Sequence, residues 1–184
     1  GRLGLVLPSG LVSDAGSAGL RRLLFSRSAV EQIVGFDNRS GTFPIHRSVK
    51  FVLVTATSGE RTREIACRFG ETNPAMLEGS LTEDGRLDSR WFTSRIAIDR
   101  LEHISGDDLS IPDIRSPIDF AIVERAATLF EPLGSPRSWR ACFGRELNAT
   151  EDRASLTEHG DGLPVFEGKH IEPFKADAAL PRWR

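Results

Sequence analysis

The sequence predicts an α/β fold, because strand-like and helix-like segments alternate through its first sixty residues. Residues 2–7 form a short apolar run that ends at a Pro-Ser-Gly turn, and residues 31–37 contain a second apolar run. Residues 49–57 are rich in β-branched side chains and give the strongest strand signal of the chain. With a helix between the first two runs, the expected order is strand, helix, strand, loop, strand.

The individual elements follow from local patterns. The first strand has few polar interruptions, which is typical of a buried strand. In the helix that follows, Ser13 or Asp14 is a suitable N-cap, and Leu20, Leu23 and Leu24 recur at helical spacing while Arg21 lies mostly off that apolar stripe. A strand–helix–strand unit favours parallel pairing with a right-handed crossover. The last two strands are expected to form an antiparallel hairpin.

The pattern weakens after Gly59. Residues 63–69 and 90–98 have strand-like composition, and Ser116 followed by Pro117 opens a helix near residues 117–130 with Ile118 and Ile122 on one face. We therefore expect three parts: the α/β segment 1–60, a mixed α+β connector 61–140, and a further region 141–184.

Composition narrows the class of protein. The chain has 184 residues, 39% hydrophobic and 27% charged, with a net charge of −2. No apolar run approaches the roughly 18–20 residues that span a bilayer, so we expect no membrane partner. Two isolated thiols are typical of a cytosolic protein. Cys67 and Cys142 lack paired-ligand spacing, which argues against a disulfide scaffold and a zinc site. The chain opens without Met directly into a strand, so we expect it to be cut from a longer protein.

A local basic stretch is compatible with nucleic acid. Residues 38–59 contain no Asp or Glu but include Arg39, His46, Arg47 and Lys50. In an extended segment, His46 and Lys50 would share one face and Arg47 the other, and these side chains would suit a DNA phosphate. Ordinary solvated charges at a strand entrance are the alternative.

Three stretches together resemble the adenine-N6 DNA methyltransferases of type IIG and type IIL restriction-modification systems. Residues 1–11 (GRLGLVLPSGL) look like the fifth strand of the methyltransferase fold, and residues 35–51 (GFDNRSGTFPIHRSVKF) resemble the hairpin that ends it. Residues 145–150 (RELNAT) and 163–174 (LPVFEGKHIEPF) are similar to the segment that opens the target-recognition region. The fold implied is a partial Rossmann-like methyltransferase sheet followed by a connector.

This resemblance implies a function and a set of residues. The parent protein would bind double-stranded DNA in the bacterial cytoplasm and transfer a methyl group from S-adenosylmethionine to a flipped adenine. Phe43 would stack on that base, although its position alone equally suits a ring packed in its own hairpin. Lys169 would stand at the start of the recognition region, with a structural cap as the alternative. The glycine-rich cofactor loop and the Asn/Asp-Pro-Pro-aromatic catalytic motif have no match here, since the chain has no Pro-Pro pair and no tyrosine. We therefore expect no cofactor bound by this segment, no catalytic residue in it and no activity from it alone.

Two rival interpretations remain. A noncatalytic DNA-specificity or interaction protein could share the tail of this fold, and a small self-contained α/β domain would need no DNA at all. If the neighbouring strand of a methyltransferase sheet is missing, residues 2–7 present an unpaired edge. In that case, the segment is expected to associate with itself as an edge-strand homodimer.

Overall fold

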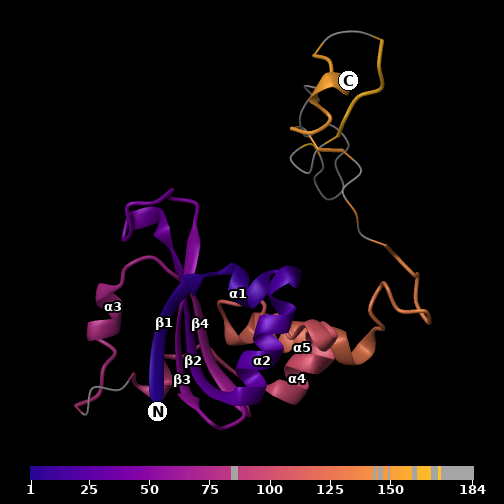
Figure 1. Cartoon of the computed structure of the whole chain (residues 1–184). Helices are drawn as coiled ribbons and strands as arrows, with labels where there is room; N and C mark the ends of the chain where they lie inside the picture. The colour runs from indigo at the N-terminus through magenta and orange to yellow at the C-terminus, as the bar shows by residue number, and fades with distance from the viewer. Residues whose placement is uncertain are drawn as a thin grey trace. The chain divides into compact units, whose positions relative to one another are not determined.

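A computed structural model describes residues 1–83, 87–142, 144, 147–148, 150–158, 161–166 and 170. These fall into two compact units, Gly1–Pro132 and Leu133–Arg184. The first unit contains the sheet and the α-helices (Figure 1). In the described part of the second unit, the regular element is one 3-10 turn, η5 (Arg153–Ser155).

The first unit is built on a five-stranded sheet with the order β1-β3-β2-β4-β5. The strands are β1 (Arg2–Pro8), β2 (Ser28–Asp37), β3 (Lys50–Ser58), β4 (Glu64–Glu71) and β5 (Ser94–Ala97). β3 is antiparallel to both β1 and β2, β4 is parallel to β2, and β5 is antiparallel to β4. The carboxyl ends of β1, β2 and β4 therefore lie at the same end of the sheet.

This architecture confirms the predicted mixed α/β class and the strand–helix–strand–hairpin order. It also corrects one expectation about pairing. β1 and β2 run in the same direction but do not pair, because β3 lies between them and is bonded to both. The predicted antiparallel hairpin is β2–β3, whose register includes Phe36 opposite Phe51 and Asp37 opposite Lys50.

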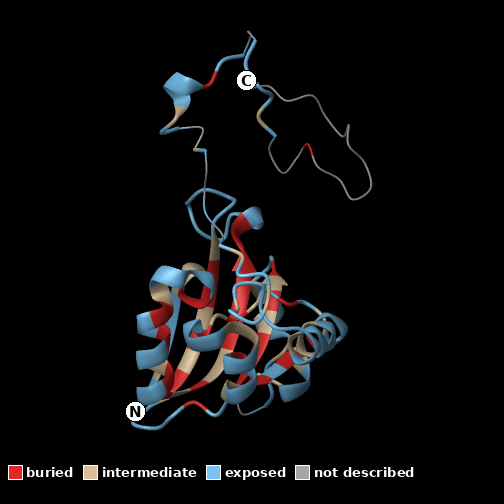
Figure 2. Ribbon diagram, turned by 90° about the vertical axis from the view of Figure 1, so that its right-hand side faces the viewer, coloured by how far each residue is buried: buried red, intermediate tan, exposed pale blue. Residues whose placement is uncertain are grey.

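Helices cover both faces of the sheet unequally. The helices are α1 (Gly10–Ser13), α2 (Ala18–Arg27), α3 (Ala75–Glu78), α4 (Ile98–Ser105) and α5 (Pro117–Leu129). α2, α4 and α5 lie on one face, and the short α3 lies on the other (Figure 1). The main core forms where Phe25, Leu101 and Phe120 from the three longer helices meet strand residues such as Ile33 and Val54. Figure 2 shows buried segments both along the strands and on the helices beside them.

The predicted apolar stripe of α2 is wrong for two of its three residues, since only Leu24 packs against the core. Leu20 and Leu23 are each 56% exposed, whereas Arg21, expected off the stripe, is completely buried. The guanidinium group of Arg21 donates to the carbonyl oxygens of Leu11, Asp14 and Asp108 at 2.9, 2.8 and 2.7 Å. Burial lowers the pKa of Arg21, while nearby Asp108 and Asp14 raise it less. These carbonyls satisfy three guanidinium donors, and that explains how a charged side chain occupies the core.

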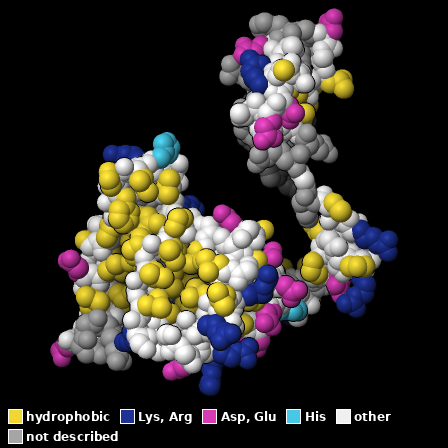
Figure 3. All heavy atoms as spheres, viewed as in Figure 1, with side chains coloured by type: hydrophobic (Ala, Val, Ile, Leu, Met, Phe, Trp, Pro, Cys, Tyr) yellow, Lys and Arg dark blue, Asp and Glu magenta, His cyan; other side chains and the backbone are white. Residues whose placement is uncertain are grey.

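β1 was expected to be buried, and this is wrong because it is an edge strand. Within the pairing with β3, Ser9 N–H donates to Lys50 O and Ser58 N–H donates to Gly1 O, so odd-numbered residues bond to β3. Hydrogen-bonded and non-hydrogen-bonded residue pairs alternate along an antiparallel ladder. The backbone N–H and C=O groups of Arg2, Gly4 and Val6 therefore point away from β3, toward the unpaired edge of the sheet. Leu5 and Val6 are 44% and 54% exposed. Figure 3, seen from the side on which β1 lies nearest the viewer, shows hydrophobic side chains spread widely over this face.

The helix predicted near residues 117–130 is confirmed as α5. The Ser116 hydroxyl oxygen accepts from the Asp119 N–H at 3.1 Å, and Pro117 occupies the first turn. α5 buries Phe120 against the core, whereas Ile118 and Ile122, on the apolar face that the sequence indicates, are exposed.

Candidate nucleic-acid interface

The loop between β2 and β3, residues 38–49, stands at the carboxyl end of β2 and is organised by one buried side chain. Asn38 has no exposed surface. Its Oδ1 accepts from the Phe43 N–H at 2.9 Å, and its Nδ2 donates to Phe43 O and Ile45 O at 3.1 and 3.2 Å and, at a longer 3.5 Å, to His46 O. Gly41, with a φ of 74°, supplies the left-handed residue that closes the first turn. Asn38 thus fixes the backbone on both sides of Phe43.

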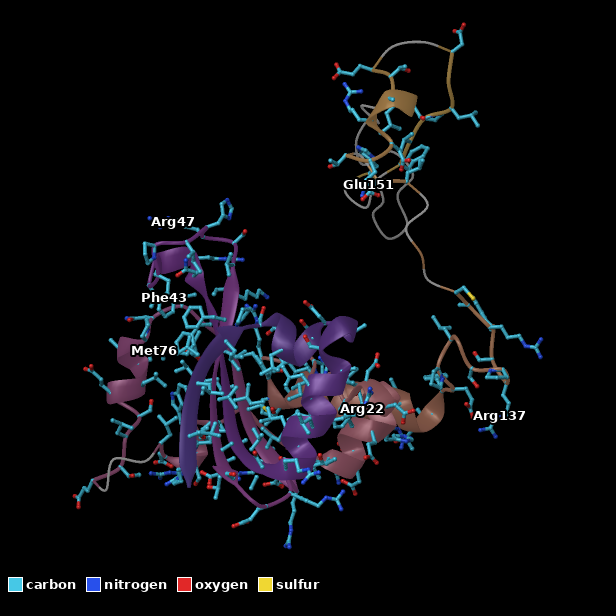
Figure 4. The ribbon with its side chains drawn as sticks, in the orientation of Figure 1. Arg22, Phe43, Arg47, Met76, Arg137 and Glu151 are labelled. Carbon is cyan, nitrogen blue, oxygen red and sulfur yellow. The ribbon has the colours of Figure 1, made fainter. Side chains whose placement is uncertain are left out.

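Phe43 lies at the surface of this loop against an aromatic pair. Its ring meets the Phe51 ring edge-to-face with 4.9 Å between centroids, and Phe51 stacks on Phe36 at 5.2 Å. Phe43 remains 37% exposed. Figure 4 places its side chain beside the sheet on the side that carries Met76 of α3. The ring is therefore neither fully packed in its hairpin nor fully solvated.

The basic residues of the loop differ in what they contact. The His46 ring nitrogen Nδ1 lies 2.7 Å from Ser48 Oγ and 3.2 Å from the backbone nitrogen of Ser48. Arg47 donates to Arg39 O at 2.9 Å and lies at the outer tip of the loop (Figure 4). The expected extended segment is wrong here, because Val49 N–H bonds back to His46 O and makes residues 46–49 a turn. The predicted alternation of His46 and Lys50 against Arg47 does not apply.

Lys50 belongs to an ionic chain at the base of the loop. Its Nζ lies 2.7 Å from Asp113 Oδ2, Arg115 lies 3.4 Å from the same carboxylate, and Arg115 also reaches Asp37 at 3.8 Å. Burial alone would raise the pKa of Asp113, but hydrogen bonds from Lys50 and Arg115 outweigh it and lower the pKa. The hydrogen bond to Asp113 in turn raises the pKa of Arg115. Lys50 is thus held by a carboxylate of the connector.

The structure brings Phe43, His46 and Arg47 together on one loop and places Lys50 at its root. Lys169 lies outside the described residues. Sequence reasoning missed Asn38 and Asp113, although an Asn at the end of a strand and before a Gly turn is a typical signal of side-chain-to-backbone bonding. Asp113 gave no local signal, because its partner Lys50 is 63 residues away.

Among the described residues, no group of His, Cys, Asp and Glu side chains is arranged to hold a metal ion. Across the same residues, no helix combines the length and hydropathy that a membrane span needs.

Comparison with known proteins gives a distant structural likeness. No protein-family model matches the sequence, and no curated protein matches it. One similar solved chain belongs to a type I restriction-modification system, with 17% identity, a TM-score of 0.43, and coverage of 70% of this chain and 33% of that one. Another is a modification subunit assigned to a type I restriction enzyme from Vibrio vulnificus YJ016, with 19% identity, a TM-score of 0.39, and coverage of 55% and 23%. This chain spans about a third or less of either protein.

The first unit is a mixed α/β structure with a five-stranded mixed sheet. Over part of its length the chain has distant structural similarity to a chain of a type I restriction-modification system and to a modification subunit of a type I restriction enzyme.

Proposed function

We propose that this chain is the closing part of the catalytic domain, and the start of the target-recognition region, of a site-specific DNA adenine-N6 methyltransferase of a restriction-modification system. The observation that carries the proposal is the β2–β3 loop, in which Asn38 holds Phe43 at the surface. The order of strand, helix, strand and hairpin is what the sequence resemblance implies, and it supports the same assignment.

The proposed role of this chain is to bind and hold the target base. Adenine N6 is inaccessible within a duplex, so an enzyme that acts on it must take the base out of the stack. The lost stacking is replaced by an aromatic side chain, worth about 1–3 kcal/mol per base. Phe43 suits this role because its edge-to-face contact with Phe51 supports the ring while part of it stays exposed.

Phosphate contacts are assigned to the tip of the loop. Arg47 is exposed, it is bonded to a backbone oxygen rather than to an acid, and its segment contains no Asp or Glu. His46 lies beside it. Lys50 is a weaker candidate than the sequence suggests, because contact with a phosphate would compete with Asp113. Lys169 remains a proposed contact at the start of the recognition region.

S-adenosylmethionine would supply the methyl group in the parent protein. The cofactor loop and the catalytic Asn/Asp-Pro-Pro-aromatic motif that the family resemblance implies have no match in this sequence. No step of the transfer is therefore assigned to these residues. The 184-residue chain alone is expected to bind DNA without methylating it.

Methylation assays separate this proposal from a noncatalytic specificity protein, which would share the DNA surface but need no cofactor. The parent protein, incubated with labelled S-adenosylmethionine and adenine-containing duplex, is expected to transfer label. Phe43→Ala is expected to reduce kcat/KM tenfold or more, about 1.4 kcal/mol. Ile45→Ala is the matched control, since Ile45 is a half-exposed apolar residue of the same loop.

The outcomes discriminate clearly. If Phe43→Ala methylates DNA as well as the wild type, the enzyme class is supported but Phe43 has a packing role and does not stack on the base. No transfer at all, with duplex binding intact, would favour the noncatalytic protein.

A further inference from the structure

A second site lies at the carboxyl ends of β1, β2 and β4, on the face of the sheet opposite Phe43. It is a cavity of about 150 Å³. Side chains alternate along strands, so Phe36 and Phe51 project toward the side of Phe43 while Asp37 and Val52 project to the other side. The cavity lies beside α1 and residues 111–115 of the connector. Ligands of open α/β sheets bind at this end, beyond the carboxyl ends of the strands.

The cavity has an apolar interior because of one glycine. A Cβ on Gly35 would lie 2.3 Å from Cδ1 of Phe69, so only glycine lets the Phe69 ring lie across β2 at this point. Val12, Val52 and Ile111 add further apolar wall. A cavity of about this size, when lined by apolar side chains, accommodates a single six-membered ring.

Asp37 gives the cavity an acceptor with unmet capacity. Its side chain is 8% exposed, and its closest cations are the Arg39 and Arg115 guanidinium nitrogens, each at 3.8 Å. Hydrogen bonds require about 2.7–3.2 Å. Among the described residues, no hydrogen bond to this carboxylate is formed. An ionised carboxylate can accept on both oxygens, and two parallel bonds make the strongest match.

The charges around the cavity indicate a neutral ligand. Among the charged side chains that line the cavity, Asp37 and Asp113 are balanced by Lys50 and Arg115, so a further cation or anion would be unfavourable. Arg39, which also reaches Asp37, is largely exposed and lies outside the lining. The chemistry required is therefore a flat, uncharged ring that presents two adjacent donors to Asp37. It should also carry an acceptor for the donors in the cavity lining, which include Ser9 and Arg115.

We propose that this cavity binds the guanine base. Guanine presents its N1–H and its exocyclic amino group side by side to one carboxylate, and its O6 is an acceptor next to them. Adenine pairs one donor with an acceptor at the corresponding edge, and cytosine offers one amino donor there, so neither satisfies both oxygens of Asp37. The six-membered ring fills the apolar interior, and the five-membered ring stays at the mouth. Phe43, the residue assigned to the flipped adenine, does not line this cavity.

The test is a ligand series on the unmodified full chain, followed by nuclear magnetic resonance. Guanosine is expected to shift the amide signals of Gly35, Asp37 and Gly70 and to bind at least tenfold more tightly than inosine, which lacks the amino group. Guanosine should also bind more tightly, by a similar factor, than adenosine and than 1-methylguanosine, which lacks the N1–H. Equal binding of guanosine and inosine, or shifts confined to other residues, would overturn the proposal, as would no binding.

Two variants sharpen the result and identify the source of the base. Asp37→Asn is expected to abolish the preference for guanosine, and Asp119→Asn, the same change at an exposed position of α5 outside the cavity lining, is expected to leave guanosine binding unchanged. A preference that survives Asp37→Asn would refute the assigned contact. Guanosine monophosphate is then compared with a short single-stranded oligonucleotide containing one guanine. Tighter binding by the oligonucleotide would identify unpaired guanine in nucleic acid as the ligand, and tighter binding by the monophosphate would identify a free nucleotide.

Discussion

Replacing Asn38 by Ala is expected to release the loop that carries Phe43. Three side-chain hydrogen bonds of 3.2 Å or less would be lost. Each such bond contributes about 0.5–1.5 kcal/mol net, so their loss costs about 1.5–4.5 kcal/mol of local stability. That range corresponds to a roughly ten- to thousandfold rise in loop opening. Because Asn38 has no exposed surface, water cannot replace these bonds without local rearrangement.

Native-state hydrogen exchange measures this change directly. The protection factor of the Phe43 amide, which donates to Asn38 Oδ1, should fall by that ten- to thousandfold range. Asn38→Asp keeps this acceptor but removes the amide donors and faces carbonyl oxygens with a carboxylate, so the loop should again open. Asn73→Ala is the matched control, since exposed Asn73 caps only a short turn. Unchanged protection of Phe43 in Asn38→Ala would show that the loop is held by other contacts.

The other predictions concern charge, thiols and the open sheet edge. Arg47→Ala should reduce the slope of log K against log salt for duplex binding by about 0.9, the value of one phosphate contact, whereas Lys50→Ala should change it less, because Lys50 is paired with an acid. Burial raises the pKa of the Cys67 thiol to about 12, so Ellman's reagent should modify only the exposed Cys142 in the native chain and both thiols in denaturant. The isolated chain should self-associate through β1 as an edge-strand homodimer. Light scattering should show that Val6→Lys, at an exposed position of this strand, shifts the chain to monomer. An unmodified chain that is monomeric at all concentrations would contradict the homodimer.

The strands of the first unit could be predicted from sequence because their signal is local. The β-branched run of β3 and the Pro-Ser-Gly turn after β1 define two of them without any knowledge of their neighbours. Their order could not be predicted in this way. The insertion of β3 between β1 and β2 depends on backbone pairing between residues far apart in the sequence, such as Leu5 with Val54.

Burial of polar residues was equally beyond the sequence patterns. Arg21 is in the core because its guanidinium reaches Asp108 O, 87 residues away, and helical periodicity alone would assign it to solvent. Conversely, Leu20 and Leu23 are exposed although their spacing is that of a buried stripe. The candidate loop was easier to identify, since its basic residues, its Gly turn and Phe43 are contiguous. Its anchor Asn38 had a local signal, an Asn before a Gly turn, but its bonding partners Phe43 and Ile45 needed the three-dimensional structure.

The ionic chain gives the connector a direct influence on the candidate interface. Asp113 bonds to Lys50 at the root of β3, and Arg115 reaches Asp37 at the end of β2, so both strands of the hairpin are tied to the same short segment. Gly70, with a φ of 83°, leaves the space that Arg115 occupies, because a Cβ there would lie 2.8 Å from its Cδ. Lys50 therefore acts in the fold as a positioning residue, whereas Arg47 at the loop tip has no acid in its segment to compete with phosphate. Two basic residues of one stretch thus take separate roles according to whether a carboxylate from a distant part of the chain reaches them.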